Sequence, residues 1–206
     1  MRDDLLSGLR PAFVLTLLFA ALLGLVYPAV LTGAAQALFP WQANGSLVTA
    51  QGRVVGSALI GQTFREDRNF HGRPSAAGKG YDALASSGSN LGPASAALDE
   101  RVRGTMAALA AANPESAGRP IPADLATASA SGLDPHISPA AASYQADRVA
   151  RARGLAPARV RAVVAAQVEP PLLGLIGEPR VNVLALNRAL DALPPAATPA
   201  VTAGRK

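Results

Sequence analysis

The sequence predicts an α+β protein with a single N-terminal transmembrane helix followed by one small extracytoplasmic domain, built from a short β meander and about four helices. Three observations support this fold class. No charged residue occurs between Arg10 and Arg53, short β-branched runs punctuated by glycine follow, and segments with helical periodicity occupy much of the remaining chain. We divide the chain into a cytoplasmic N-terminus (1–10), a transmembrane helix (11–33), the extracytoplasmic domain (34–195) and a disordered tail (196–206).

The transmembrane helix is predicted from an apolar segment that begins at Pro11 and reads PAFVLTLLFAALLGLVYPAVL. About 20 apolar residues in a helix span the hydrocarbon core of a bilayer. We expect Pro11 in the first turn, where its missing N–H is not needed, and a kink at Pro28, which membrane helices tolerate. Tyr27 lies near one end, where it suits the membrane–water interface.

A cleaved signal peptide is the alternative for this segment. Its support is a short basic start, the break at Pro28 and a possible cleavage motif at 35–37, after which the domain would be released as a secreted binding protein. Two acidic residues near the N-terminus and a run long enough to span favour a retained anchor. Arg2 and Arg10 flank its N-terminal side, so the positive-inside rule places the N-terminus in the cytoplasm and the domain outside, in the periplasm of a Gram-negative cell.

The meander is predicted from short runs at 46–48 and 53–55, which flank a turn-like Gln51-Gly52, and from a further run at 58–60. Two or three strands are expected there. The following segment, 64–93, is rich in Gly, Ser, Asn and Pro and reads as one long irregular excursion. Because loops of this length in compact domains are usually functional or disordered, and aromatic residues would pin this one, we expect an ordered functional loop.

Helices are predicted in the rest of the domain from apolar periodicity and end signals. Ser138 as N-cap and Pro139 at the first position begin one of them, and Gly154 ends it. The predicted helices cover 95–112, with Leu98, Val102, Met106 and Leu109 on one face, 139–153, 157–168 and 183–193. Between them, 124–138 is expected to be a thin strand or an extended loop, and 170–180 an apolar strand or loop.

Composition limits the chemistry. The chain has no cysteine, which excludes disulfides, thiolate metal sites and cysteine nucleophiles. The net charge is +5, but the arginines are scattered and no basic stripe is interleaved with aromatic residues, so nucleic-acid binding is not predicted. Aromatic residues are 4% of the chain and alanine is abundant, which predicts a modest core of closely packed small side chains.

Catalytic and metal sites have little support. The two histidines, His71 and His136, form no metal-ligand pair, and no metal site is predicted. A membrane-tethered enzyme that uses His136, Asp134 and a loop serine is an alternative, although a Gly-x-Ser-x-Gly elbow is absent. A phosphate-binding loop is also absent, since 78–80 reads Gly-Lys-Gly without the following Ser or Thr. We predict no catalytic residues.

Several motifs become specific when they are read together in their order along the chain. The longest, DLATASASGLDPHISP at 124–139, is highly distinctive. The other motifs lie at 24–28, 32–36, 39–40, 42–46, 56–62, 70–76, 81–82, 86–93, 152–154 and 177–184. With these motifs the chain closely resembles the KdpC family, the C subunits of high-affinity potassium-transporting Kdp ATPases, over about residues 11–193.

The resemblance implies an accessory subunit of an inner-membrane complex that imports potassium at the cost of ATP. Its implied partners are a channel-like potassium-binding subunit, a P-type ATPase subunit and a small single-helix subunit, together with membrane lipid. The implied role is assembly of the complex and action as a catalytic chaperone that raises the ATP affinity of the ATPase subunit. The chain lacks the Asp-Lys-Thr-Gly-Thr phosphorylation motif, in agreement with a non-catalytic subunit.

ATP is the cofactor that the family implies, but the predicted topology separates this domain from cytoplasmic ATP. No nucleotide-binding residue is therefore assigned, and an effect on ATP affinity would be indirect coupling through the partner ATPase subunit. The membrane helix is expected to pack against partner helices, because Gly24 offers a small face.

Partner contacts are expected in three polar segments, 70–76, 86–93 and 129–139, because function concentrates on ordered loops. The alternative for each segment is packing within the domain. The candidate interface residues are Phe70, Gly72, Arg73, Pro74, Ser87, Ser89, Asn90, Ser129, Ser131, Asp134 and His136, and the candidate positions on the membrane helix are Pro11, Gly24, Tyr27 and Pro28.

Overall fold

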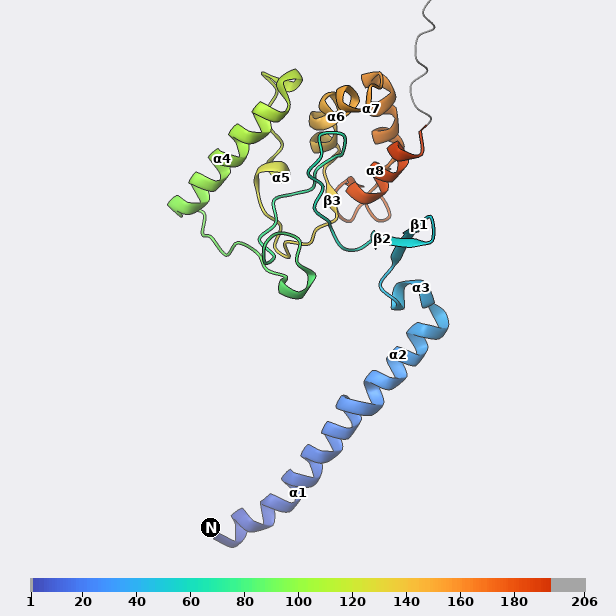
Figure 1. Cartoon of the computed structure of the whole chain (residues 1–206). Helices are drawn as coiled ribbons and strands as arrows, with labels where there is room; N and C mark the ends of the chain where they lie inside the picture. Colours follow the sequence, from blue (N-terminus) through green and yellow to red (C-terminus); the bar gives the residue numbers. More distant parts are fainter. Residues whose placement is uncertain (1, 194–206) are drawn as a thin grey trace, which may run out of the picture. The chain divides into compact units, whose positions relative to one another are not determined.

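The computed structural model describes residues 2–193, and side chains from Ser7 onward. The tail predicted to be disordered, 196–206, lies outside the described residues. The chain divides into two compact units, of which the first ends at Ser57 and the second begins at Ala58. Together they hold an apolar N-terminal helix, short strands and several further helices, which confirms the predicted α+β class (Figure 1).

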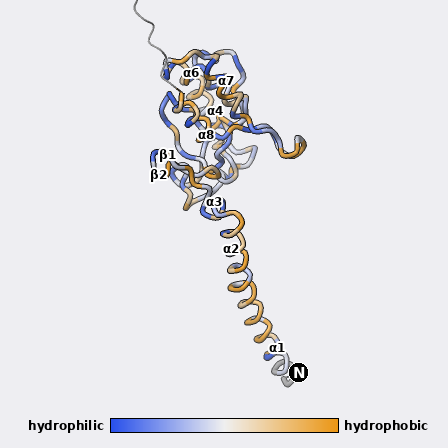
Figure 2. Tube along the Cα trace, turned by 90° about the vertical axis from the view of Figure 1, so that its right-hand side faces the viewer, coloured by the Kyte–Doolittle hydropathy of each residue, from blue (hydrophilic) through white to orange (hydrophobic). Residues whose placement is uncertain are grey.

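The first unit is dominated by one continuous helix, made of α1 (Arg2–Ala21), the π-helical turn η1 (Leu22–Val26) and α2 (Tyr27–Leu38). Within the described residues, Ser7–Leu38 is the one helix long and apolar enough to cross a membrane. Figure 2 shows most of this helix in orange, the colour of hydrophobic residues. The helix begins before and ends after the predicted 11–33, so Pro11 lies inside it and not in its first turn, which corrects that expectation.

The π turn lies immediately before Pro28 and shows how this proline is accommodated. The backbone N–H of Tyr27 donates to the carbonyl of Leu22, five residues earlier. Pro28 has no N–H to offer the carbonyl of Gly24, and its ring crowds that carbonyl. The wider turn is therefore the local distortion that accompanies the proline, and such turns commonly mark functional positions in helices.

A β-hairpin follows the helix within the first unit. After the short helix α3 (Pro40–Ala43), the strands β1 (Leu47–Ala50) and β2 (Arg53–Ser57) pair in antiparallel fashion. Gln51 and Gly52 both have positive φ, 49° and 75°, as the tightest hairpin turns require.

The third run of the predicted meander, 58–60, is a turn ending in a single bridge residue and not a strand. The carbonyl of Ala58 accepts a hydrogen bond from the side chain of Asn182, at 2.9 Å. In a strand, this carbonyl would accept from the backbone N–H of a neighbouring strand. The meander therefore has two strands.

The second unit is built around three helices and a small antiparallel sheet. The helices are α6 (Pro139–Arg153), α7 (Pro157–Ala166) and α8 (Val183–Asp191), and the sheet has the order β3 (His136–Ile137), β5 (Arg180–Asn182), β4 (Val168–Glu169). The predicted ends of α6 are confirmed: the Ser138 hydroxyl accepts from the N–H of Ala141 at 3.0 Å, and Gly154 ends the helix with φ 65°.

The core lies where these helices meet. Small residues of α6 such as Ala146 and Ala150 are completely buried, which lets α7 approach α6 closely, and Val160 of α7 and Leu186 of α8 belong to the same core cluster. Phe70, from the long polar segment, is also completely buried in this core. The aromatic side chain thus pins the segment, and the expectation that the segment is ordered is confirmed.

The remaining helices lie outside this core. α4 (Ala96–Ala112) begins and ends close to its predicted limits and carries an Asp99–Arg103 ion pair, but it has no fully buried residue. Of its predicted face, Met106 is exposed and Thr105 is half-buried in its place. α5 (Ala123–Ala126) is a short helix where a thin strand or extended loop was predicted. Two 3-10 turns, η2 (Ala83–Ala85) and η3 (Pro114–Ser116), lie before and after α4 in the chain.

Candidate partner-binding site

The three polar segments predicted to contact partners, 70–76, 86–93 and 129–139, converge in the second unit, and together they form what we call the loop cluster. The N–H of Ser87 donates to the carbonyl of Ser131 at 3.0 Å, and the hydroxyl of Ser75 donates to the carbonyl of Gly132 at 2.6 Å. Segments far apart in the sequence are therefore joined by direct hydrogen bonds.

Gly132 explains why the segments approach so closely. Its φ of 67° is left-handed, and a β-carbon there would lie 2.6 Å from the N of Ala77 and 2.7 Å from the carbonyl oxygen of Ser87. Only glycine combines this backbone conformation with that clearance. The turn at 131–132 is thus a packing requirement of the loop cluster.

Arg73 links two segments of the cluster. Its Nη1 lies 3.1 Å from Oδ2 of Asp134, and its Nη2 donates to the carbonyl of Ala128 at 3.3 Å. The Arg73 carbonyl in turn accepts the hydroxyl of Tyr81 at 2.7 Å, and a β-carbon at Gly72 would collide with that same tyrosine. Burial, assisted by the charge of Asp134, raises the pKa of Tyr81 to about 12, so the phenol remains a hydrogen-bond donor.

Asp134 and His136 form the second part of the site. The backbone N–H of His136 donates to Oδ1 of Asp134 at 3.0 Å, while its ring Nδ1 lies 3.6 Å from the same oxygen and its Nε2 lies 3.9 Å from Glu169. Burial alone would raise the pKa of Asp134, but the hydrogen bonds from His136 and Arg73 outweigh it and lower the pKa. Asp134 is therefore a fixed anion.

A polar cleft of about 330 Å³ opens beside these residues. Three predicted residues line it, Arg73, Asp134 and His136. Ile137 and Ser138 also line it and lie within the predicted segment 129–139, although they were not among the candidate residues. The other lining residues, Asp124, Glu178, Pro179 and Arg180, lie outside the three predicted segments. A signal for them was present, since Asp124 opens the distinctive 124–139 motif and 178–180 lies within the 177–184 motif, but nothing in sequence spacing indicated that the two motifs meet.

The other predicted interface residues divide by burial. Phe70 lies in the core, where its backbone N–H and carbonyl both pair with the side-chain amide of Asn187, at 2.7 and 3.0 Å. Ser129 is buried, and its hydroxyl accepts from the N–H of Gly132 at 2.9 Å. Neither side chain lies at a surface. Ser131 and Asn90 are exposed, and Gly72, Pro74, Ser87 and Ser89 are half-buried.

A larger groove of about 410 Å³ lies between α4 and residues 62–81, and Gly72, Arg73 and Pro74 line it. His71 is on its wall. Burial, together with the nearby charge of Arg148, lowers the pKa of His71, so this imidazole is neutral over a wider range than an exposed one.

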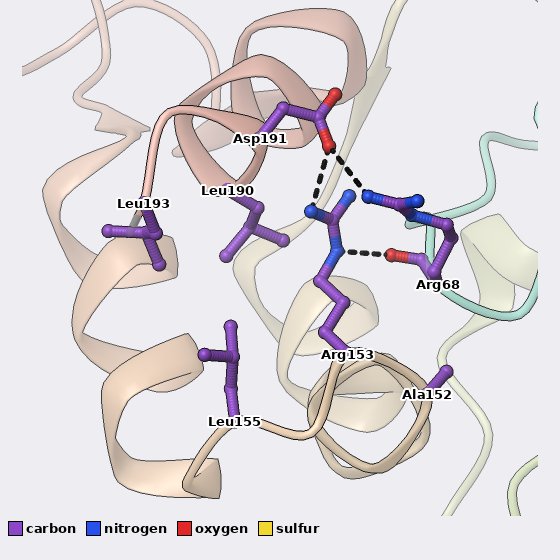
Figure 3. A pocket seen from close by; sticks show the side chains of 7 residues that line it. All are labelled: Arg68, Ala152, Arg153, Leu155, Leu190, Asp191 and Leu193. Atoms are coloured by element: carbon purple, nitrogen blue, oxygen red, sulfur yellow. Dashed lines mark hydrogen bonds and ion pairs between the residues drawn. The ribbon is translucent and has the colours of Figure 1, made fainter. Parts of the chain in front are cut away.

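A third pocket, of about 300 Å³, is lined by Arg68, Ala152, Arg153, Leu155, Leu190, Asp191 and Leu193 (Figure 3). Its charged side chains form ion pairs and hydrogen bonds with one another. Nη1 of Arg153 lies 2.8 Å from Asp191, Nη2 of Arg68 lies 3.5 Å from the same carboxylate, and Nε of Arg153 donates to the Arg68 carbonyl at 2.6 Å. None of its lining residues belongs to the predicted interface.

The serine hydroxyls around the cleft are hydrogen-bonded to other groups of the chain. The hydroxyl of Ser138 donates to Asp124 and accepts from Ala141, and those of Ser129 and Ser131 accept from backbone N–H groups, at Gly132 and Leu133. Across residues 7–193, no serine hydroxyl is hydrogen-bonded to His136, and no group of three metal-ligating side chains is present. What the cleft offers is an ordered set of charges and donors.

The candidate positions on the membrane helix, Pro11, Gly24, Tyr27 and Pro28, are all exposed in this chain. A β-carbon at Gly24 would have no atom within 4 Å, so the glycine leaves an open notch on the helix surface. Its packing against partner helices remains a prediction.

Comparisons with known proteins identify the family. A sequence profile described as K+-transporting ATPase, c chain (KdpC) matches residues 9–192. Proteins named potassium-transporting ATPase KdpC subunit are similar to the chain. The one from Caulobacter vibrioides is 62% identical over 94% of this chain and 98% of its own length. Those from Polaromonas naphthalenivorans and Sorangium cellulosum are 59% and 58% identical, over 93% and 91% of this chain and 97% and 98% of their own lengths. The chain therefore belongs to the KdpC family, the c chains of K+-transporting ATPases.

Proposed function

We propose that the chain is a non-catalytic, membrane-anchored subunit of an ATP-driven potassium-import complex, and that it holds its partners through the polar cleft. The observation that carries this proposal is the convergence of Arg73, Asp134 and His136 with residues 178–180 around one cleft. We expect other subunits of the same ATPase to occupy the cleft, because the relatives of this chain are named as subunits of a potassium-transporting ATPase.

The geometry of the cleft favours a binding surface. Arg73 and Asp134 are largely buried and hold each other, so their orientation is fixed before any partner arrives. Arg180 and Glu169 pair at 3.0 Å but remain about half exposed, and they offer charge to a partner at the edge. A preorganised site loses little conformational entropy on binding, which raises its affinity for a given contact area.

The membrane helix would place this binding surface. We infer that the N-terminus is cytoplasmic and that the domain is extracytoplasmic, because Arg2 and Arg10 flank one end of the apolar segment and the next charge is Arg53. The partners are then a channel-like potassium-binding subunit, a P-type ATPase subunit and a small single-helix subunit. The notch at Gly24 would let a partner helix approach closely.

An effect on ATP affinity would act through the complex. In the inferred topology the domain and cytoplasmic ATP lie on opposite sides of the membrane, so the catalytic-chaperone role would be a coupling between two sites. Such coupling is reciprocal: if the chain raises ATP affinity, a bound ATP analogue must tighten the chain's association by the same factor. To test this role, the affinity of the complex for ATP is measured in detergent with and without the chain, and the affinity of the chain for the complex with and without an ATP analogue. If either affinity is unchanged, the role is contradicted.

Co-purification tests the main proposal. The tagged full chain is expressed with the other subunits, extracted in mild detergent and recovered by its tag. We expect the larger membrane subunits to elute with it, and a monomeric chain that elutes alone would overturn the proposal. Arg180→Glu, at the cleft, is expected to lower partner recovery about tenfold, whereas Arg159→Glu, an exposed arginine on α7, serves as the matched control.

A further inference from the structure

A hairpin between β4 and β5 carries a group of exposed aliphatic side chains. Leu172, Leu173, Leu175 and Ile176 are between 63% and 88% exposed. In Figure 2 this hairpin projects from the second unit with an orange tip. Other large exposed apolar residues of this unit, such as Leu84 and Met106, occur singly, and single ones need no explanation. A contiguous set marks an interaction surface.

The hairpin is preformed. Leu172 and Ile176 exchange both backbone hydrogen bonds, at 2.9 and 3.0 Å, and the N–H of Gly174 donates to the carbonyl of Pro171 at 3.0 Å. Leu173 and Gly174 turn the chain with φ of 54° and 73°. Because the backbone is already folded, docking of the tip requires little further ordering.

The hairpin is also fastened at its base. β4 and β5 pair through Val168 with Val181 and Glu169 with Arg180, and the last two add a side-chain ion pair. Its returning segment, 178–180, which leads into β5, forms one wall of the polar cleft. The apolar tip therefore continues directly from the charged cleft. An apolar anchor beside a polar rim is the usual anatomy of a protein–protein interface.

The composition of the tip favours a protein over a lipid surface. Residues 170–177 read PPLLGLIG and contain no aromatic residue, lysine or arginine, the residue types that hold segments at a membrane interface. Glu169 and Glu178 flank the tip and would be repelled by anionic lipids.

We propose that the hairpin tip, Leu172 to Ile176, inserts into an apolar recess on another protein subunit of the same complex. This inference rests on the proposed function and adds to it the part of the surface that anchors the partner. The tip supplies the apolar contact, and the adjacent cleft supplies the charged rim that sets its orientation.

The test uses the tagged full chain co-expressed with its partner subunits. The double change Leu173→Asn and Leu175→Asn removes the apolar tip, and asparagine tolerates the left-handed backbone at 173. We expect partner recovery to fall at least about tenfold, while circular dichroism and thermal unfolding stay unchanged, because neither leucine lies in the core. The matched control is Leu84→Asn, since Leu84 is 99% exposed. Leu175→Met, which keeps the tip apolar, should retain the partners.

The outcomes separate the two proposals. If the wild-type chain recovers no partner, the proposed function fails; if the wild type and the double variant recover partners equally, only the hairpin inference fails. An equal loss with Leu84→Asn also overturns the inference.

The chain has no cysteine, so an environment-sensitive fluorophore on Leu175→Cys reports the tip alone. Its emission should shift to the blue in the assembled complex, and a blue shift in lipid vesicles that contain only this chain would assign the tip to lipid.

Discussion

Nη1 of Arg73 lies 3.1 Å from Oδ2 of Asp134, although the two residues are 61 positions apart in the chain. The pair joins segment 70–76 to segment 129–139 on the wall of the polar cleft. Both side chains are largely buried, so each would be costly to leave without the other. The relationship makes the shape of the cleft depend on the ionisation of Asp134.

The first prediction concerns this ionisation. The pKa of Asp134 is lowered from 3.8 in the folded chain, since hydrogen bonds from His136 and Arg73 outweigh the effect of burial. A carboxyl group with a depressed folded pKa stabilises the fold above its unfolded pKa, and this stabilisation is lost as the pH falls through the folded pKa. Wild type should therefore unfold at a higher temperature than Asp134→Asn at about pH 7, and the gap should narrow as the pH falls below 3.8.

Thermal unfolding of the full chain in mild detergent, followed by circular dichroism across this range, measures the gap. Other titrating groups are common to both proteins and cancel in the difference. A gap that stays constant down to the lowest pH would contradict the assignment of Asp134 as the group responsible.

A second prediction separates two penalties at glycine. Gly132→Ala places a methyl group against Ala77 and Ser87 and also strains a left-handed backbone, so we expect a loss of about 3 kcal/mol in the free energy of unfolding. Gly118→Ala has a similar φ, 78°, with no atom within 4 Å of the added carbon, and should cost only about 1 kcal/mol. Denaturant unfolding of both variants measures the difference, and equal losses would show that the close approach at Gly132 is unimportant.

A third prediction concerns Arg148, which is buried beneath segment 64–71. Its guanidinium donates to the carbonyls of Asp67 and Asn69 and to the side chains of Asn113 and Gln145, at 2.5 to 3.1 Å. Arg148→Met removes a donor from all four acceptors, of which the Gln145 oxygen keeps the N–H of His71, and a loss of about 3 to 5 kcal/mol is expected.

The control for this change is Arg159→Met, because Arg159 is exposed on α7. It should shift the unfolding midpoint little. Limited proteolysis adds a local measurement: cleavage within 64–71 should accelerate in Arg148→Met before global unfolding. Equal midpoints for the two variants would mean that the buried network does not hold the segment.

The fourth prediction concerns topology. Ala107 is exposed on α4, and the chain has no native cysteine, so Ala107→Cys carries the one thiol. In spheroplasts of a Gram-negative host, an impermeant maleimide should label this thiol without lysis. Labelling that requires lysis would place the domain in the cytoplasm and would allow direct contact with ATP.

Local signals account for the parts of the fold that were predicted correctly. The cap at Ser138 and the stop at Gly154 depend on bonds to residues three or four positions away, and the membrane helix depends on a continuous apolar run. Where α4 was predicted, periodicity located the helix, but its exposed Met106 shows that a stripe of apolar residues does not guarantee a buried face.

Long-range packing decided the rest. Phe70 and Ser129 are buried within the domain, which their positions in polar segments did not indicate, and the meeting of Arg73 and Asp134 with Arg180 creates a cleft that no spacing in the sequence indicates. The exposure of the tip at 172–176 could not be predicted from the sequence either, since an apolar run of that length is as typical of a core strand as of a surface hairpin.

By itself, the sequence determined the family, the apolar N-terminal helix, the ends of α6 and the absence of cysteine chemistry. Each of these follows from residue identity or from interactions across a few positions. Only the tertiary structure decided which polar segments meet, which predicted residues face the surface, and that the hairpin tip is left uncovered. These properties depend on contacts between residues tens of positions apart, and such contacts are fixed by the packing of the whole domain rather than by any local pattern.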